Sequence, residues 1–240
     1  MNMTNKKFYE LSLSDRLESL ARESGVPLES LLPLSGAGGL TPEQADHMVE
    51  NAVGTFSLPL GIARNFVING NPYLIPMVVE EPSVIAGASF MAKLARAGGG
   101  FTAEADAPEM IGQLQLLDIQ DFDSTRRTLE AHKAELLQLA AGIDPVLTRF
   151  GGGPRDLILP TIEASAIGAF LVLHLIPDVR DAMGANAVNT ALENLAPRVA
   201  ELTGARVHLR ILSNLADRRL ARASCTIPLS ALAFEGYSAE

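Results

Sequence analysis

The stretch PMVVEEPSV at positions 76–84 places two adjacent carboxylates, Glu80 and Glu81, between a β-branched run and Pro82. A carboxyl group can act as a general acid where its surroundings hold its proton, and is an ordinary solvated charge elsewhere. Because proline cannot continue a central strand and keeps the preceding residue extended, the stretch also fits an edge strand that turns at an acidic corner. The local pattern leaves both interpretations open.

A second stretch, DAMGANAVNT at positions 181–190, begins a predicted helix. Gly184 would let a ligand approach the backbone, and the free N–H groups and dipole of a first helical turn favour an anion. The alternative is a plain helix start with Asp181 as the cap. The sequence has no G-x-G-x-x-G motif, and GGGPRD at 151–156 lacks the Lys-Ser/Thr pair of a P-loop, so we interpret it as a turn.

The remaining reactive residues are scattered. The four histidines lie on different predicted elements and define no catalytic triad or metal site. The single cysteine, Cys225, lies in the alternating segment ASCTIPL and is predicted to be a small buried hydrophobe. These residues therefore predict neither nucleophilic catalysis nor a bound metal.

Composition describes a globular chain, because 48% of the 240 residues are apolar and 20% are charged. The net charge of −9 and the absence of tryptophan argue against nucleic acid as a partner. The longest apolar run, at 166–177, is too short to span a membrane, and the N-terminus does not resemble a secretory signal. We expect a cytoplasmic protein.

Local signals predict the elements of the first hundred residues. Ser14 is expected to cap a helix that Gly25 ends, and Thr41 starts a capping box whose helix should run to about Asn51. Two β-rich runs flank Asn69-Gly70, a dipeptide typical of tight hairpins. A strand pair followed by a helix from Val84 therefore carries Glu81 at the junction.

Residues 108–213 have a different pattern of predicted strands and helices. A strand at 111–119 precedes a helix at 123–142, which Asp123 or Ser124 could cap. Two strands, a helix at roughly 184–203 and a strand at 206–212 follow. The order β-α-β-β-α-β is that of the ferredoxin-like split motif, in a domain of about 100 residues.

Taken together, ENAVG (50–54), VVEEPS (78–83), GGGPRD, DAMGANAVNT and SNLADRR (213–219) resemble the class II, bacterial-type hydroxymethylglutaryl-CoA reductases. The resemblance implies an α+β homodimer with a large α/β domain for the CoA thioester and an inserted ferredoxin-like cofactor domain. It places the large domain at 1–107, the cofactor domain at 108–213 and a return to the large domain at 214–240, whose C-terminal part is missing.

The same resemblance implies roles for individual residues. Glu81 falls where the family has a catalytic glutamate, which would be a general acid shielded from water. Ser83, Glu50 and Asn51 fall near the hydroxymethylglutaryl group. The residues expected to hold the dinucleotide are Asp181, Met183, Gly184, Asn186 and Asn214.

The implied reaction interconverts hydroxymethylglutaryl-CoA and mevalonate plus CoA by two hydride transfers. Asp144 falls where some members place an acidic residue against the adenosine ribose, which favours NAD(H) over NADP(H). Asp144 beside Pro145 could also simply end a helix.

The family also uses a lysine, an aspartate and a histidine that follow the cofactor domain. This chain has four lysines, Lys6, Lys7, Lys93 and Lys133, none of which lies in such a segment. We therefore expect the chain alone to turn over negligibly. The alternatives are a non-catalytic cofactor-binding and dimerisation module and, least favoured, an unrelated acyl-CoA-binding α+β protein.

Overall fold

The computed structural model describes residues 6–36, 39–233 and 238. It divides into two compact units, Met1–Ala103 with Ala223–Glu240 (unit 1) and Glu104–Arg222 (unit 2). Unit 2 extends a few residues beyond the predicted 108–213 on both sides, because residues 214–222 pack with it. Most of the segment FEGYSAE, predicted to resume the large domain, lies outside the described residues.

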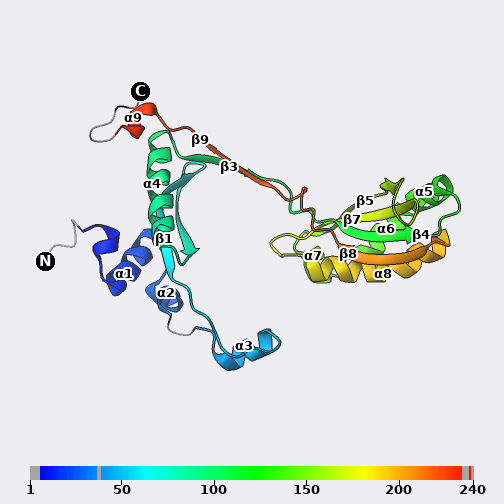
Figure 1. Ribbon diagram of the computed structural model, residues 1–240, viewed down its shortest axis with the longest axis horizontal. Coiled ribbons are helices and arrows are strands. Elements are labelled where there is room, and N and C mark those ends of the chain that lie inside the picture. Colours follow the sequence, from blue (N-terminus) through cyan, green and yellow to red (C-terminus); the bar gives the residue numbers. More distant parts are fainter. Residues whose placement is uncertain (1–5, 37–38, 234–237, 239–240) are drawn as a thin grey trace. The chain divides into compact units, whose positions relative to one another are not determined.

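Unit 1 begins with short helical elements (Figure 1). Helix α1 starts after Ser12, whose hydroxyl accepts a hydrogen bond from the Asp15 backbone N–H at 3.1 Å. The predicted cap, Ser14, is therefore wrong, since two serines in one stretch compete for this position and Ser14 lies inside the helix. The helical elements are η2 (Phe8–Glu10), α1 (Leu13–Ser24), α2 (Leu28–Leu31), η3 (Leu32–Ser35) and α3 (Pro42–Met48).

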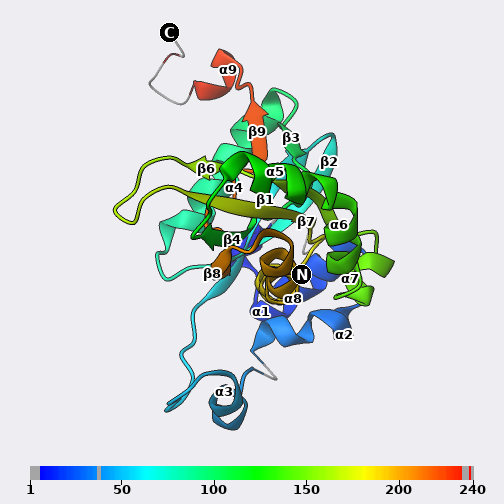
Figure 2. The ribbon, with the colours of Figure 1, turned by 90° about the vertical axis from the view of Figure 1, so that its right-hand side faces the viewer.

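Helix α3 has the predicted capping box, in which Thr41 and Gln44 bond each other's backbone N–H groups. It ends at Met48, three residues before the predicted Asn51, because Val49 is already extended. An extended segment then leads to the sheet, and α3 stands apart from the other helices of unit 1 (Figure 2).

The sheet of unit 1 has the strand order β2-β1-β3-β9. Strands β1 (Leu60–Ile68) and β2 (Asn71–Val78) form the predicted hairpin, with Asn69 and Gly70 both at positive φ. Strands β3 (Phe101–Ala105) and β9 (Ala221–Cys225) complete the sheet, and α9 is Leu229–Leu232. Cys225 is exposed, so the predicted burial is wrong, because every residue of the outermost strand β9 is solvent-accessible.

Helix α4 (Ser83–Ala97) packs on β1 and ends at Gly98, as predicted. Its buried residues are Ala92 and Ala95, whose small side chains allow a close approach to the neighbouring backbone. The order β2, tight corner, α4 fixes the position of Glu81.

Unit 2 contains a five-stranded antiparallel sheet, in which four strands follow the order β5-β7-β4-β8 and the two-residue β6 pairs with β7. When β4, β5, β7 and β8 are numbered 1 to 4 along the chain, their order across the sheet is 2-3-1-4. This order confirms the predicted ferredoxin-like fold. The strands are β4 (Gly112–Leu117), β5 (Gly153–Ile158), β6 (Thr161–Ile162), β7 (Phe170–Asp178) and β8 (Arg206–Leu212).

The helices of unit 2 differ from prediction in their details. The predicted helix 123–142 is two helices, α5 (Phe122–Ala131) and α6 (Lys133–Ala141), interrupted at His132. Asp121, rather than Asp123 or Ser124, caps α5 by accepting from the Ser124 N–H at 2.9 Å. Helices α7 (Pro145–Arg149) and α8 (Ala185–Thr203) complete the unit.

Buried apolar side chains gather in unit 2, where leucines from β4, β7, α5, α6 and α8 form one cluster. In the described part of unit 1 the buried hydrophobic residues are Leu20, Ala45, Ala63, Ala92 and Ala95. Unit 1 thus buries little large apolar surface by itself. No described helix is both long and apolar enough to cross a membrane.

Candidate functional site

The corner between β2 and α4 holds Glu81. Strand β2 ends at Val78, and the Val79 N–H donates to the Pro59 carbonyl at 3.1 Å. The Glu81 Oε2 atom accepts from the Ser83 backbone N–H at 2.9 Å and from the Ser83 hydroxyl at 2.6 Å. The carboxylate of Glu81 therefore binds the first residue of α4, and the structure brings these two predicted site residues into contact.

This environment favours the ionised form of Glu81. The Ser83 hydroxyl, followed by the Ser83 and Val84 backbone N–H groups, outweighs partial desolvation and lowers the pKa of Glu81. Glu81 is also exposed. The expected shielded carboxyl that holds its proton is therefore wrong for this chain, because no described residue covers the corner and donors contact the carboxylate.

An open groove of about 850 Å³ lies in unit 1 beside this corner. Pro82, Ile85 and Ser89 line it from the α4 side. A bulge in β1 between Ala63 and Phe66 places Arg64 and Asn65 along it. Four of the lining side chains are cationic: Lys7, Arg16, Arg64 and Lys93.

The groove's two arginines are held by other residues of unit 1. Arg64 pairs with Glu23 at 2.6 Å and lies over the Phe8 ring, 4.7 Å from its centroid. Arg16 donates to the Tyr9 carbonyl at 2.7 Å. Lys93 makes no ion pair with any residue that the structure describes.

Glu50 and Asn51 lie in the turn after α3, and both are exposed. Asn51 has a φ of 61°, in the left-handed region that asparagine tolerates better than most residues. Within the described residues, no hydrogen bond joins either side chain to Glu81 or Ser83. The structure therefore leaves these two predicted residues apart from the corner.

Helix α8 of unit 2 begins at a tight turn. Gly184 is its N-cap, with a φ of 96°, and a Cβ there would lie 2.8 Å from the Val179 side chain. Glycine is therefore required both by conformation and by packing. The alternative interpretation, in which Asp181 only caps the helix, is wrong: Asp181 lies three residues before the cap and makes no capping hydrogen bond, because the left-handed glycine starts the helix.

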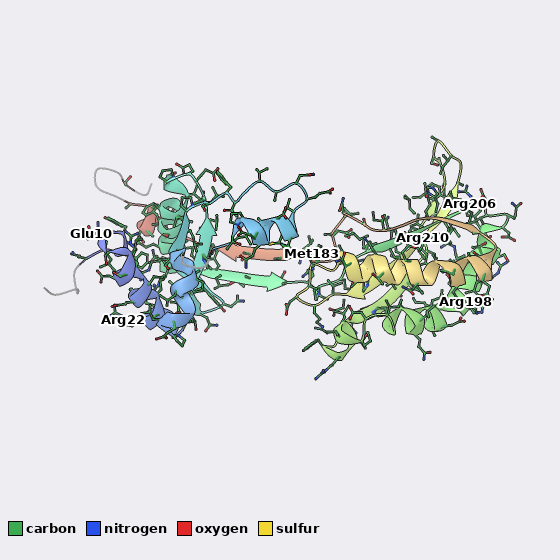
Figure 3. All side chains as sticks on the ribbon, turned by 90° about the horizontal axis from the view of Figure 1, so that it is seen from below. Glu10, Arg22, Met183, Arg198, Arg206 and Arg210 are labelled. Carbon is green, nitrogen blue, oxygen red and sulfur yellow. The ribbon has the colours of Figure 1, made fainter. Side chains whose placement is uncertain are left out.

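The predicted cofactor residues Met183, Asn186 and Asn214 are all exposed. Met183 is 73% exposed and lies at the beginning of α8 (Figure 3). Asn186 is exposed in the first turn of the helix, and Asn214 is exposed in the segment after β8. The turn presents Asp181, Met183 and the start of α8 to solvent.

A buried carboxylate precedes the turn. Asp178, at the end of β7, is 5% exposed and was not singled out from the sequence. Its Oδ2 accepts from Arg155 at 2.9 Å, and its Oδ1 accepts from the Arg180 backbone N–H at 3.0 Å. Burial alone would raise the pKa of Asp178, but these hydrogen bonds and the nearby arginines outweigh it, so that the pKa is lowered.

Asp178 makes the free energy of unfolding depend on pH in the acid range. Because its pKa is lower in the folded chain, its contribution is full above the unfolded pKa of about 3.9 and is lost as pH falls through the folded pKa. We expect Asp178→Asn to lower the free energy of unfolding at pH 7 by about 1–3 kcal/mol and to flatten its loss in acid. Urea unfolding from pH 7 to pH 3 measures both effects. The control, Glu130→Gln, removes an exposed carboxylate from α5, and an equal change in both variants would contradict the assignment.

Asp144 begins helix α7. Its Oδ1 accepts from the Leu147 N–H at 2.8 Å, so Asp144 is a helix cap rather than the end of the preceding helix. No described residue donates a hydrogen bond to its Oδ2. One oxygen of this half-buried carboxylate is thus free for a ligand.

The histidines and acidic residues form no further centre. Burial, helped by Arg218, lowers the pKa of His174, whose Nε2 lies 3.4 Å from the Gln113 side-chain nitrogen. Among the residues whose placement is described, no group of three or more His, Cys, Asp or Glu side chains could hold a metal ion.

Comparison with known sequences identifies the family of the chain. The sequence profile of the family described as hydroxymethylglutaryl-coenzyme A reductase matches residues 12–239. The 3-hydroxy-3-methylglutaryl-coenzyme A reductase of Archaeoglobus fulgidus is 46% identical over 216 residues, which is 90% of this chain and 49% of that protein. A probable reductase of Borreliella burgdorferi is 30% identical over 89% of this chain and 49% of its own length.

Solved structures give the same result. The class II 3-hydroxy-3-methylglutaryl-CoA reductase of Streptococcus pneumoniae, bound to NADPH in open conformations, matches with a TM-score of 0.86 and 38% identity. The match covers 94% of this chain and 61% of that one. The chain spans about half the length of the curated relatives it matches. The chain belongs to the hydroxymethylglutaryl-coenzyme A reductase family, among its class II members.

Proposed function

We propose that this chain supplies the thioester-binding and nicotinamide-binding parts of an NAD-dependent reductase that interconverts hydroxymethylglutaryl-CoA and mevalonate plus CoA. Family membership over residues 12–239 carries the proposal. Unit 1 is the first part of the thioester domain together with its C-terminal return, and unit 2 is the cofactor domain.

The corner at Glu81 is the reacting end of the thioester site. Each hydride transfer leaves negative charge on a carbonyl oxygen, which must meet a proton or a hydrogen-bond donor. Glu81 is the proton carrier in this proposal, and Ser83 binds the hydroxymethylglutaryl group. Because donors keep Glu81 ionised in this chain, the proton-carrying role requires a covered corner in which the pKa of Glu81 is higher.

The groove beside Glu81 suits the CoA part of the substrate. CoA carries phosphates at one end and an extended thioester arm at the other. Lys7 and Lys93 offer charges for phosphate, while Phe8 and Ile85 offer apolar contacts for the arm. Glu50 and Asn51 are assigned to the substrate by family resemblance alone.

The dinucleotide is assigned to the start of α8. The left-handed Gly184 and the free N–H groups of the first turn fit a pyrophosphate. Asp181, Met183, Asn186 and Asn214, which are all exposed, are assigned to the same site by family resemblance. When bound, the nicotinamide ring supplies or accepts the hydride. The chain's own residues hold and orient it.

Asp144 is assigned to the choice of cofactor. Its free oxygen can accept from a ribose 2′-hydroxyl and would repel a 2′-phosphate, which favours NAD(H) over NADP(H). NADPH in the Streptococcus pneumoniae structure shows that the alternative occurs in a similar protein.

Asp144→Ser tests this assignment, because serine also caps helices but removes the charge. We expect the variant to bind NADH about tenfold more weakly and NADPH no more weakly, since a charge-assisted hydrogen bond is worth about 1.5–3 kcal/mol. Fluorescence titration with both dinucleotides measures the ratio. Asp121→Ser, at the matching cap of α5, is the control. An unchanged NADH-to-NADPH ratio in Asp144→Ser would remove the assignment.

A second copy of the chain is the partner proposed for the segment after α3. Val53 and Phe56 are 104% and 88% exposed, and Met48 and Val49 are also exposed. Such a run of large apolar side chains is typical of an interface. Homodimerisation through this segment is therefore part of the proposal.

A non-catalytic role is the second candidate. It is favoured by the exposed, ionised Glu81 and by the absence of any lysine after Lys133 in the sequence. In this case the chain binds the dinucleotide without turnover. A cytoplasmic location stays a prediction in both cases.

A further inference from the structure

The turn between β7 and α8 is held by contacts from two other segments and from the end of β7. Arg219 donates from Nη1 to the Ala182 carbonyl at 2.9 Å and from Nη2 to the Arg180 carbonyl at 3.1 Å. Arg180 also donates to the Gly151 carbonyl through its guanidinium. Asp178 accepts from the Arg180 backbone N–H at 3.0 Å.

The conformation of the turn needs such support. Arg180 has a φ of 53°, in the left-handed region that costs a non-glycine residue about 1–2 kcal/mol. Gly184 is left-handed as well, four residues later. Two left-handed residues within one short turn persist where surrounding contacts over-determine them.

The contacts leave the outer side of the turn open. Asp181, Ala182 and Met183 are exposed, while the carbonyls of Arg180 and Ala182 face the half-buried Arg219. An arginine fork can bind two carbonyls at once in a fixed geometry, which a single ammonium cannot do. Arg219 thus binds two carbonyls of the turn from a position 37 residues away from Ala182 in the chain.

We propose that Arg219 is a positioning residue of the dinucleotide site. It holds the turn that presents Asp181, Met183 and the start of α8, so the site is ordered before the ligand arrives. This inference rests on the proposed function. Arg219 itself touches the backbone of the turn and no reacting atom.

Arg219→Ala in the full 240-residue chain should weaken NADH binding about tenfold. The expectation follows if the ordered turn is populated in about a tenth of the variant molecules, since apparent affinity falls in proportion to the competent fraction. Arg219→Lys keeps the charge but replaces the two-nitrogen fork by a single ammonium, and should bind NADH about three- to fivefold more weakly. Calorimetry with NADH gives both values.

Arg218→Ala is the matched control. It removes the neighbouring positive charge, whose exposed guanidinium pairs with Glu109 at 3.3 Å and does not contact the turn. We expect its affinity for NADH to stay within about twofold of the parent chain, because exposed ion pairs contribute little. An equal loss in Arg218→Ala and Arg219→Ala would show a general charge effect and overturn the proposal.

Hydrogen exchange on the ligand-free chain gives a readout that is independent of binding. The amides of residues 180–184 should exchange faster in Arg219→Ala and not in Arg218→Ala. Faster exchange with unchanged NADH affinity would mean that Arg219 is only structural, and would overturn the proposal. If Arg219→Ala does not fold, the ratio of the NADH affinities of the parent chain and Arg219→Lys decides. A parent chain that binds neither NADH nor NADPH would instead overturn the proposed function, and the positioning role with it.

Discussion

The purified 240-residue chain is expected to form no mevalonate-dependent NADH above the uncatalysed background. The oxyanion of each hydride transfer needs a donor, and the family resemblance assigns this role to a lysine segment that the sequence does not contain. Removing one member of a cooperating catalytic set commonly costs about 10⁴-fold or more in rate. The exposed and ionised Glu81 adds to the loss, because it has no proton to give at neutral pH.

The near-ultraviolet absorbance of NADH, followed with mevalonate, CoA and NAD present, checks this prediction. The matched variants are Glu81→Gln and Glu80→Gln, which remove neighbouring exposed carboxylates. Turnover that Glu81→Gln abolishes and Glu80→Gln retains would show that this chain is a complete catalyst. The non-catalytic interpretation would then be wrong.

The second large effect concerns the stability of unit 2. Leu192 on α8 is fully buried and packs over Gly112 of β4, at the centre of the leucine cluster. Leu192→Ala should lower the free energy of unfolding of unit 2 by about 3–4 kcal/mol, because the lost methyl groups leave a cavity in a packed core. The temperature at which the chain unfolds and loses dinucleotide binding should fall correspondingly.

Urea unfolding, followed by circular dichroism, measures the change. Leu139→Ala on α6 is the control, because this leucine is 42% exposed and its removal should cost under about 0.5 kcal/mol. Similar midpoints for Leu192→Ala and Leu139→Ala would contradict the packing that the structure shows.

Local signals predicted much of the fold. The Asn69-Gly70 turn, the capping box at Thr41 and the strand-helix order of residues 108–213 depend on neighbouring residues, and the structure confirms all three. The caps of α1 and α5 were displaced by two or three residues, because several Ser or Asp residues compete for each cap. Cys225 was misjudged because alternation does not reveal that a strand lies at the edge of a sheet.

The site was predictable only in part. The contact of Glu81 with Ser83, which lowers the pKa of Glu81, spans only two residues, whereas the exposure of Glu81 depends on what covers the corner. Asp178, Arg155 and Arg219 were missed because they meet across long chain separations. The only local signals were the acidic residue at the end of an apolar strand and the arginines of GGGPRD and SNLADRR.

Calorimetric titration of the full chain with NADH tests the central claim most directly. We expect one NADH to bind per chain, more tightly than NADPH, with heat that disappears when unit 2 is unfolded by urea. A chain that gives the circular dichroism of a folded α+β protein and releases no heat with either dinucleotide would contradict it.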